Sequence, residues 1–244
     1  MPYTKITKDL KKTANKEKAK LLMGFFKTGK GQYGEGDIFI GVTVPNIRKT
    51  VVEYYDETNF ETIQKLLESG IHEYRLAALL MLVKKYETVN KVKTQNIASQ
   101  QKIYNFYLKN TQYVNNWDLV DLTAPNIVGT YLLDKPKERN RLYTMAKSKD
   151  LWKKRIAILA TFALIRNNET KDVLAISKIL LKDKHDLIHK AVGWMLRELG
   201  KRVSQEKEEQ FLKRHYKQMP RTMLRYAIER FEEKKRQSYL KGTV

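Results

Sequence analysis

The sequence predicts an all-α fold from three observations. Apolar residues recur three and four positions apart over most of the chain, which is the spacing that gives a helix one apolar face. Prolines are few, only five in the whole chain. No run alternates apolar with polar residues over more than a few positions, as a half-buried strand would. The segments with helical spacing are Thr62–Leu67, Tyr74–Val83, Ile103–Leu108, Ile156–Ile165, Val173–Leu181 and Ile188–Leu196.

The prolines and glycines mark the expected breaks between helices. Four prolines are predicted to lie near helix starts or in loops, where a missing amide hydrogen costs least: Pro45, Pro125, Pro136 and Pro220. The stretch from Thr28 to Asp37 holds four glycines and has no helical pattern. We interpret it as a flexible loop that turns into a helix beginning near Pro45, with contact to a ligand as the alternative. It lacks the Gly-Lys-Ser/Thr pattern of a phosphate-binding loop.

A weak internal repeat runs through the helical segments. Arg75-Leu76-Ala77-Ala78 matches Arg155-Ile156-Ala157-Ile158 and Arg225-Tyr226-Ala227-Ile228, and Lys190-Ala191-Val192 fits the same position. The spacings of 80, 35 and 35 residues leave room for one more unit near residue 115. A period of about 35–40 residues is typical of HEAT-like helical hairpins stacked in a solenoid.

We therefore expect residues 1–244 to form a single helical-repeat domain. About residues 1–40 would supply N-terminal helices and the glycine-rich loop, and residues 41–244 the repeats. Such solenoids curve and present a concave face. The basic residue that recurs at one position would place a column of positive charge along this face. Small residues near that position would let neighbouring helices approach closely: Ala77, Ala157, Gly193 and Ala227.

The charge of the chain indicates an anionic partner. The 244 residues include 48 Lys and Arg against 27 Asp and Glu, a net charge of +21. The excess is spread over residues 1–30, 91–116, 135–155 and 201–244 instead of being confined to a tail. Positive charge distributed among helices fits a nucleic-acid surface better than a membrane anchor. A generic lysine-rich composition without a binding role is the alternative.

The composition also excludes several classes of protein. With 42% apolar and 10% aromatic residues the chain is no disordered polycation. It has no cysteine, which excludes disulfides, thiolate zinc sites and a cysteine nucleophile. The first twenty residues have no apolar run, and no segment reaches the ~20 apolar residues of a membrane span, so we expect a cytoplasmic protein. His185 and His189 lack the glutamate and third ligand of a zinc site, so no metal is expected.

Two tryptophans, an arginine and an aspartate stand at the repeat spacing. Trp117 and Asp121 are four residues apart and would share one helix face, and Asp118 would lie near that face. Trp117 precedes Arg155 by 38 residues, and Arg155 precedes Trp194 by 39. Since packed helices lie roughly 8–10 Å apart, three consecutive units would present them in a row about 20 Å long. Each residue alone could equally serve packing: the tryptophans in the core, Asp121 as a buried acceptor and Arg155 in the repeat framework.

Together these groups suit a sugar–phosphate substrate. Indoles stack on sugars or bases, and a guanidinium group holds a phosphate with its planar fork. A carboxylate weakens phosphate binding, so it makes sense where positive charge develops on the substrate. Breaking an N-glycosidic bond generates an oxocarbenium-like sugar, which Asp121 would stabilise while it orients water. Candidates for contacts with the phosphate backbone of a nucleic acid are Lys153, Lys154, Lys190, Arg197 and Arg225.

Over about residues 20–240 the sequence resembles the HEAT-like-repeat alkylpurine DNA glycosylases, the AlkD-like DNA alkylation repair enzymes. The resemblance is carried, in order, by Tyr33–Asp37, Gly41–Pro45 with Arg48, Trp117–Asp121, Trp152–Ala157, His189–Glu198 and Met219–Ala227. Several such segments in the right order are more specific than any one of them.

The resemblance implies a solenoid whose concave basic face grips duplex DNA. It also implies hydrolytic release of N3- and N7-alkylated purines by a monofunctional glycosylase without metal or cofactor, and we expect a monomer. The family's catalytic aspartate falls on Asp121, its tryptophans on Trp117 and Trp194, and its arginine on Arg155. Many members carry two consecutive tryptophans before the aspartate, and here the first is Asn116.

Two functions of other classes stay open at this point. One is a non-catalytic HEAT-repeat protein that recognises damaged or unusual DNA structure, since a fold alone does not set the chemistry. The other is a protein-binding scaffold, which the net charge of +21 disfavours. A steep fall of DNA affinity with added salt would separate the scaffold from both DNA-binding functions.

Overall fold

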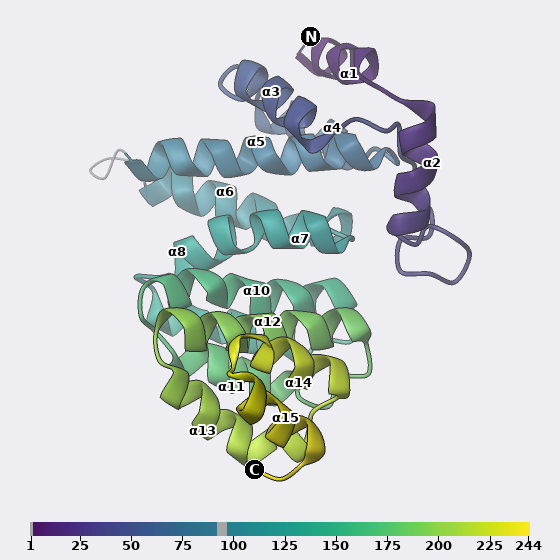
Figure 1. Cartoon of the computed structure of the whole chain (residues 1–244). Helices are drawn as coiled ribbons and strands as arrows, with labels where there is room; N and C mark the ends of the chain where they lie inside the picture. The colour runs from purple at the N-terminus through teal and green to yellow at the C-terminus, as the bar shows by residue number, and fades with distance from the viewer. Residues whose placement is uncertain (1, 92–96) are drawn as a thin grey trace. The chain divides into compact units, whose positions relative to one another are not determined.

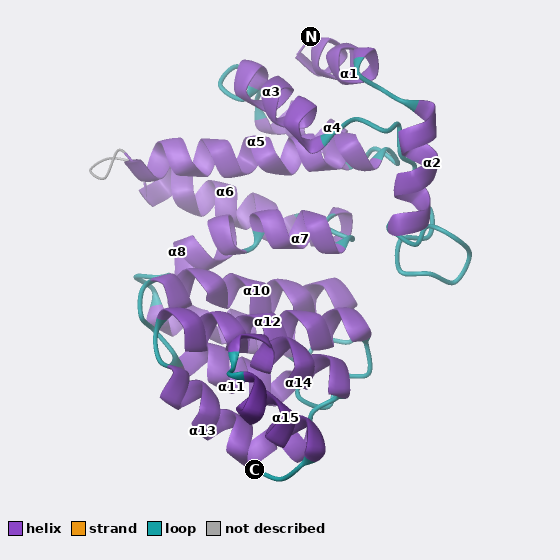
Figure 2. Cartoon of the chain, in the orientation of Figure 1, coloured by secondary structure: helices purple, strands orange, loops and turns teal. Residues whose placement is uncertain are grey.

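The computed structural model describes residues 2–91 and 97–244, and these residues form an all-α protein (Figures 1 and 2). Residues 92–96, part of the basic stretch 91–116, lie outside the described residues. Within the described ranges the only β-type pairing is a single parallel bridge between Ile38 and Ile71. The prediction of an all-α fold is therefore confirmed. Among these residues no helix combines the length and apolar character needed to cross a membrane.

The chain divides into two compact units, Met1–Ile127 and Val128–Val244. In the first unit α5 packs against α3, α4, α6 and α7. Every residue of α5 from His72 to Val83 is buried, as expected for a helix that others cover on all sides. The helices of this unit are α1 (Pro2–Lys12), α2 (Lys16–Phe25), α3 (Val44–Tyr54), α4 (Phe60–Leu67), α5 (His72–Lys91), α6 (Ile97–Lys109) and α7 (Trp117–Thr123).

The second unit stacks helices in the order of the sequence repeat. Its helices are α8 (Thr130–Leu132), α9 (Asn140–Ala146), α10 (Leu151–Arg166), α11 (Lys171–Leu180), α12 (Asp186–Arg202), α13 (Gln205–His215), α14 (Arg221–Ala227) and α15 (Glu233–Lys241). The helices α10, α12 and α14 pack consecutively, while α9 and α11 cover α10 and α13 covers α12. A Cβ atom on Gly193 would lie 2.4 Å from the carbonyl oxygen of Met223 and 2.5 Å from Cβ of Tyr226. The predicted close approach of helices at Gly193 is confirmed.

The prolines stand at helix starts and turns, as predicted. Pro45 lies in the first turn of α3, and Pro220 directly precedes α14. Pro136 begins a short 3-10 helix, and Pro125 begins a π-helical turn after α7. A single helical-repeat domain over residues 1–244, curved into a solenoid with a concave face, stays a prediction.

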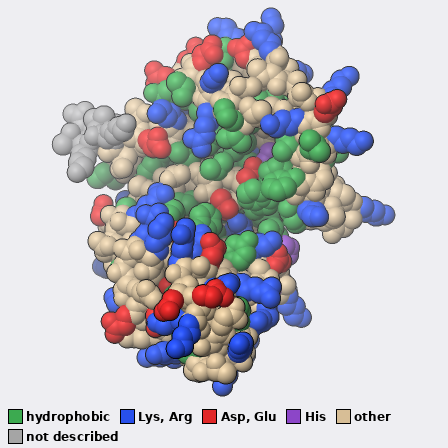
Figure 3. All heavy atoms as spheres, viewed as in Figure 1, with side chains coloured by type: hydrophobic (Ala, Val, Ile, Leu, Met, Phe, Trp, Pro, Cys, Tyr) green, Lys and Arg blue, Asp and Glu red, His purple; other side chains and the backbone are tan. Residues whose placement is uncertain are grey.

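The repeated basic residue does not form an exposed column. Arg75 and Arg155 are only 5% and 4% exposed, whereas Arg225 is exposed. The guanidinium of Arg75 donates to Asp37, and that of Arg155 donates to the carbonyl oxygen of Leu187. The predicted column of positive charge is therefore wrong at two of its three arginines, because acceptors within their own units hold these side chains in buried positions. Lys and Arg side chains are instead scattered over the face shown in Figure 3.

A buried acid on α13 makes the stability of the second unit depend on pH. Glu208 is 2% exposed, and its Oε1 finds no hydrogen-bond partner among the described residues. Burial, aided by the charge of Glu209, raises the pKa of Glu208 from 4.5 to about 8. The folded state then binds more protons than the unfolded state between these two values, so stability falls as pH rises through this window.

We expect Glu208→Gln to raise the thermal midpoint at pH 8 by a few degrees, because 1 kcal/mol shifts the midpoint of a protein of this size by roughly 2–4 °C. Below pH 5 the gain should vanish, since Glu208 is protonated in both states there. Thermal unfolding followed by circular dichroism from pH 4.5 to 8.5 measures this. The matched control is Glu209→Gln, whose carboxylate pairs with Lys235. A gain that is equal at all pH values would contradict the assignment.

Candidate active site

The short helix α7 carries two of the predicted site residues, Trp117 and Asp121. Asn116 caps the helix: its side-chain oxygen accepts from the backbone N–H of Trp117 at 2.9 Å, and its Nδ2 donates to Asp37 at 3.1 Å. Asn116 is completely buried. Asn116 stands where many members of the similar family have a tryptophan. In this protein it fixes the start of α7 through two buried hydrogen bonds.

Trp117 ends a stack of aromatic rings. Its indole lies 5.2 Å from the ring of Phe26 at 14°, and Phe26 stacks on Phe39 at 4.9 Å. Phe39 stacks in turn on the imidazole of His72 at 4.5 Å, while Phe25 meets the indole edge-on at 5.8 Å. Phe26, Phe39 and His72 are buried, whereas Trp117 is partly exposed. The stack holds the indole in place and leaves part of its surface accessible.

A buried polar network surrounds His72, the last ring of this stack. His72 contacts Oδ2 of Asp37 through Nδ1 at 3.2 Å and Oδ2 of Asp118 through Nε2 at 2.8 Å. Arg75 donates to the other oxygen of Asp37 at 2.5 Å. Burial raises the pKa of Asp37, but His72, Arg75 and Asn116 outweigh it and hold that pKa below its ordinary value. Burial lowers the pKa of His72, but the two carboxylates outweigh it and raise that pKa above 6.5.

Sequence reasoning missed most of this network. The prediction placed Asp118 near the face of Trp117 and Asp37 in the glycine-rich loop, but it assigned nothing to His72 or Arg75 beyond the repeat. The four residues meet only in the folded chain, and no local motif contains His72. The one feature of the sequence that could have pointed to this network is the pair of polar residues His72 and Glu73 at the start of an apolar helix.

Glu73 fixes the chain that leads from the glycine-rich loop into α3. Its Oε1 accepts from the N–H groups of Gly41 at 2.7 Å and Val42 at 3.2 Å, and the N–H of Ile40 is 3.1 Å from both carboxylate oxygens. Gly41 has φ +80°, and a Cβ there would lie 2.0 Å from the carbonyl oxygen of Asn15. The loop therefore does turn into a helix near Pro45, as predicted, and this part of it is tied to α5.

Asp121 lies one turn after Trp117 in a partly exposed position. Beneath α7 the phenol of Tyr107 is fully buried and hydrogen-bonds Thr123 at 2.9 Å. Burial and the nearby negative charge of Asp121 raise the pKa of Tyr107. The structure thus brings Trp117 and Asp121 together on one helix, as the four-residue spacing predicted.

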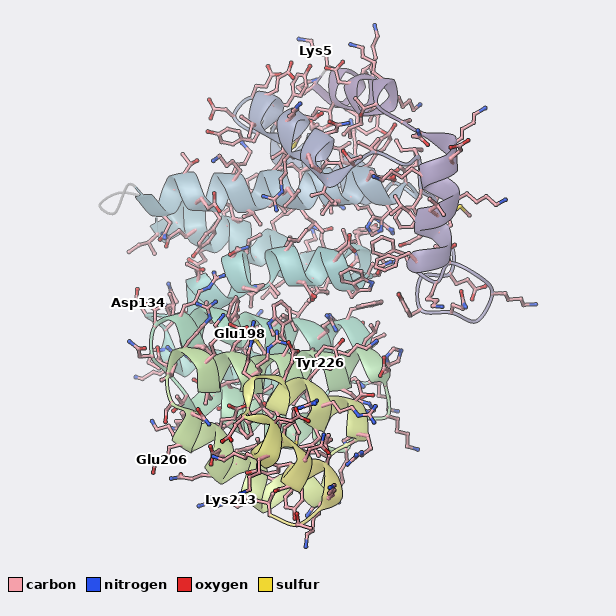
Figure 4. All side chains as sticks on the ribbon, in the orientation of Figure 1. Lys5, Asp134, Glu198, Glu206, Lys213 and Tyr226 are labelled. Carbon is pink, nitrogen blue, oxygen red and sulfur yellow. The ribbon has the colours of Figure 1, made fainter. Side chains whose placement is uncertain are left out.

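Arg155 and Trp194 lie on neighbouring helices of the second unit, α10 and α12. Arg155 is buried and donates to the carbonyl oxygen of Leu187 at 2.5 Å. Trp194 is partly exposed, and its Nε1 donates to Glu198, labelled in Figure 4, at 3.3 Å. Because Trp117 and Asp121 belong to the first unit, the predicted row of all four residues stays a prediction.

The five predicted DNA-backbone residues differ in their partners. Lys154 pairs with Asp183 at 2.5 Å, Lys190 with Asp186 at 2.7 Å, and Arg197 with Glu229. Lys153 and Arg225 form no ion pair with another described residue. Within the described ranges they are thus the two of these five cations without an ion-paired carboxylate.

The two histidines at the start of α12 bind the backbone. His185 caps the helix by accepting from the N–H of Leu187 at 3.1 Å, and Nε2 of His189 contacts the carbonyl oxygen of Asp183 at 2.6 Å. Within the described ranges no group of three or more His, Asp or Glu could hold a metal ion.

The comparisons with known proteins agree with the resemblance. The model of the DNA alkylation repair enzyme family matches residues 6–231, so the chain belongs to this family. A role in the repair of alkylated DNA follows from that membership. Among solved structures the chain is similar to a "predicted DNA alkylation repair enzyme" from Enterococcus faecalis, with 15% identity and a TM-score of 0.65 over 91% of this chain and 98% of that one. At this identity the similarity shows the fold alone. No curated protein matches the sequence.

We expect Glu73→Ala to lower the free energy of unfolding by about 3 kcal/mol, because amides at positions 40–42 lose a charged acceptor. Urea unfolding at neutral pH measures the change. Glu61→Ala is the matched control, since its carboxylate forms only an exposed pair with Lys65. Equal losses in the two variants would show that Glu73 does not secure the chain before α3.

Proposed function

We propose that this protein is a monofunctional DNA glycosylase that hydrolyses the N-glycosidic bond of N3- or N7-alkylated purines in duplex DNA. The observation that carries the proposal is a carboxylate, Asp121, one helical turn from a partly exposed indole, Trp117, on a helix fixed at its start. Family membership supports alkylation repair in general, and this pair of side chains supports the specific reaction.

The proposed reaction needs little catalytic assistance from the protein. A purine alkylated at N3 or N7 carries a positive charge, so the bond between C1′ and the base breaks with its electron pair moving to the base, which leaves neutral. The deoxyribose becomes oxocarbenium-like, and the carboxylate of Asp121 stabilises it. Water positioned by Asp121 then adds to C1′, and its proton passes to the surrounding water. The reaction needs no general acid, metal or cofactor, because the leaving group is already activated.

The other predicted residues bind and orient the DNA in this proposal. Trp117 and Trp194 contact the deoxyribose and backbone at the lesion. Arg155 anchors a phosphate, for which its buried guanidinium must first leave the carbonyl oxygen of Leu187. Lys153 and Arg225 contribute their whole charge to backbone contacts. Lys154, Lys190 and Arg197 contribute less, because a carboxylate already neutralises each of them. We propose that the protein acts as a monomer.

We expect Asp121→Asn to slow the release of free base from duplex DNA containing N7-methylguanine by at least about 100-fold, since the transition state loses its negative partner. Affinity for DNA should be unchanged or slightly raised because one negative charge is lost. Single-turnover release and titration of binding measure the two effects. The matched control is Asp134→Asn, an exposed aspartate of the second unit.

Two results would overturn this proposal. If Asp121→Asn releases the base at the wild-type rate, Asp121 has no part in the reaction. If the wild type releases no alkylated base but binds DNA tightly with strong salt dependence, the protein is a non-catalytic binder of damaged DNA.

The salt dependence of DNA binding tests the basic residues separately. Each phosphate contact adds about 0.9 to the slope of log K against log salt. We expect Lys153→Gln and Arg225→Gln each to reduce that slope by roughly 1. Lys65→Gln, which removes a lysine already paired with Glu61, should leave it unchanged. Equal slopes in all four proteins would place Lys153 and Arg225 outside the DNA-binding surface.

A further inference from the structure

The network around His72 joins three separate segments of the first unit. Asp37 ends the glycine-rich loop, His72 begins α5, and Asp118 lies in the first turn of α7. Asp37 reaches α7 by two routes: directly through Asn116, and through His72 to Asp118. Both routes end beside Trp117. The start of the helix that carries Trp117 and Asp121 is therefore held by side chains outside that helix.

The hydrogen bonds of His72 require a second ring proton. Ionised carboxylates only accept hydrogen bonds, and a neutral imidazole has a single N–H. Both ring nitrogens of His72 face carboxylate oxygens, Nδ1 that of Asp37 and Nε2 that of Asp118. In the neutral form, one nitrogen would turn its lone pair towards an oxygen at 3.2 Å or 2.8 Å. The imidazolium satisfies both carboxylates.

The surrounding charges favour the same form. Asp37 and Asp118 contribute two negative charges, and Arg75 contributes one positive charge, so a protonated His72 makes the buried set neutral. Oδ1 of Asp118 is buried without a hydrogen-bond partner among the described residues, which increases its need for a cation nearby.

The other charged groups near His72 do not replace it. The carboxylate of Glu73 is turned to the amides of residues 40–42. On the α2 side, Lys18 lines the same cavity of about 250 Å³ as His72 and Asp118. Among the described residues Lys18 forms no ion pair with Asp37 or Asp118. The remaining walls nearest the imidazole are the rings of Phe26 and Phe39.

We propose that His72, in its protonated form, is a positioning residue for α7: by binding Asp118 it holds Trp117 and Asp121 in the orientation that base release uses. The catalytic part of this inference rests on the proposed function. Loss of the proton removes one of the two links between Asp37 and α7. The raised pKa of His72 means that its stabilising contribution is complete below pH 6.5 and is lost as pH rises through the higher folded-state pKa. Base release should therefore decline on the alkaline side.

The first experiment needs no substrate. The chain has four histidines and three tryptophans, so the ¹⁵N signals of imidazoles and indoles can be assigned with single variants. At pH 6.5 we expect both ring nitrogens of His72 to be protonated in most molecules, with a titration midpoint above 6.5. The indole signal of Trp117 should shift with the same midpoint. A midpoint below 6.5, or an indole signal that does not follow the titration of His72, would overturn the proposal.

The second experiment measures single-turnover release of N7-methylguanine across pH 6–9. His72→Gln should be about ten- to hundredfold slower at pH 7, as small misplacements of reacting groups are. It should bind DNA with wild-type affinity and lose the alkaline decline. Asp118→Asn keeps His72 but removes one carboxylate, so the decline should move to lower pH. His215→Gln, in the second unit, is the control and should match the wild type.

A His72→Gln variant with the wild-type rate and pH profile would overturn the positioning role. If the wild type itself releases no base, the proposed function fails, and the titration of the substrate-free protein still decides whether protonated His72 holds α7.

Discussion

The arrangement of the first unit depends on one buried carboxylate. Asp37 is 5% exposed and binds Arg75, His72 and Asn116 at once. A charge removed from water must be compensated by partners, and loss of a partner from a buried pair costs roughly 3–5 kcal/mol. These bonds tie the glycine-rich loop to α5 and to the start of α7, so the position of the indole of Trp117 depends on a residue 80 positions earlier in the chain.

Local sequence patterns predicted the helices and the close packing at Gly193. They did not predict the polar contacts between residues that are far apart in the chain. The all-α fold, the loop before Pro45 and the close approach at Gly193 follow from apolar spacing, glycine content and residue size. The hydrogen bonds of Asp37 join residues that are 35, 38 and 79 positions apart, and the spacing of residue types does not predict them. Arg75 and Arg155 both lie near the start of a helix, but their exposure depends on acceptors supplied by other segments.

In the candidate site, too, local spacing predicted some features, and tertiary contacts determined the others. Four-residue spacing sufficed to place Trp117 and Asp121 on one helix, because a helix converts spacing directly into proximity. The role of Asn116 as a cap, the ring stack over Phe26 and the bond from Trp194 to Glu198 required coordinates. Side chains that orient the site are thus less visible in a sequence than the groups they orient.

In the proposed function, the acidic partners of three basic residues have a kinetic consequence. Asp183, Asp186 and Glu229 offset the charges of Lys154, Lys190 and Arg197, so the count of 48 Lys and Arg overstates the number of cations that attract phosphate. Affinity for undamaged duplex grows with the number of phosphates neutralised, and high affinity slows departure from each site. A protein that must search long stretches of intact DNA for rare lesions gains from such internal counter-charges, because shorter dwell times let it inspect more base pairs in the same interval.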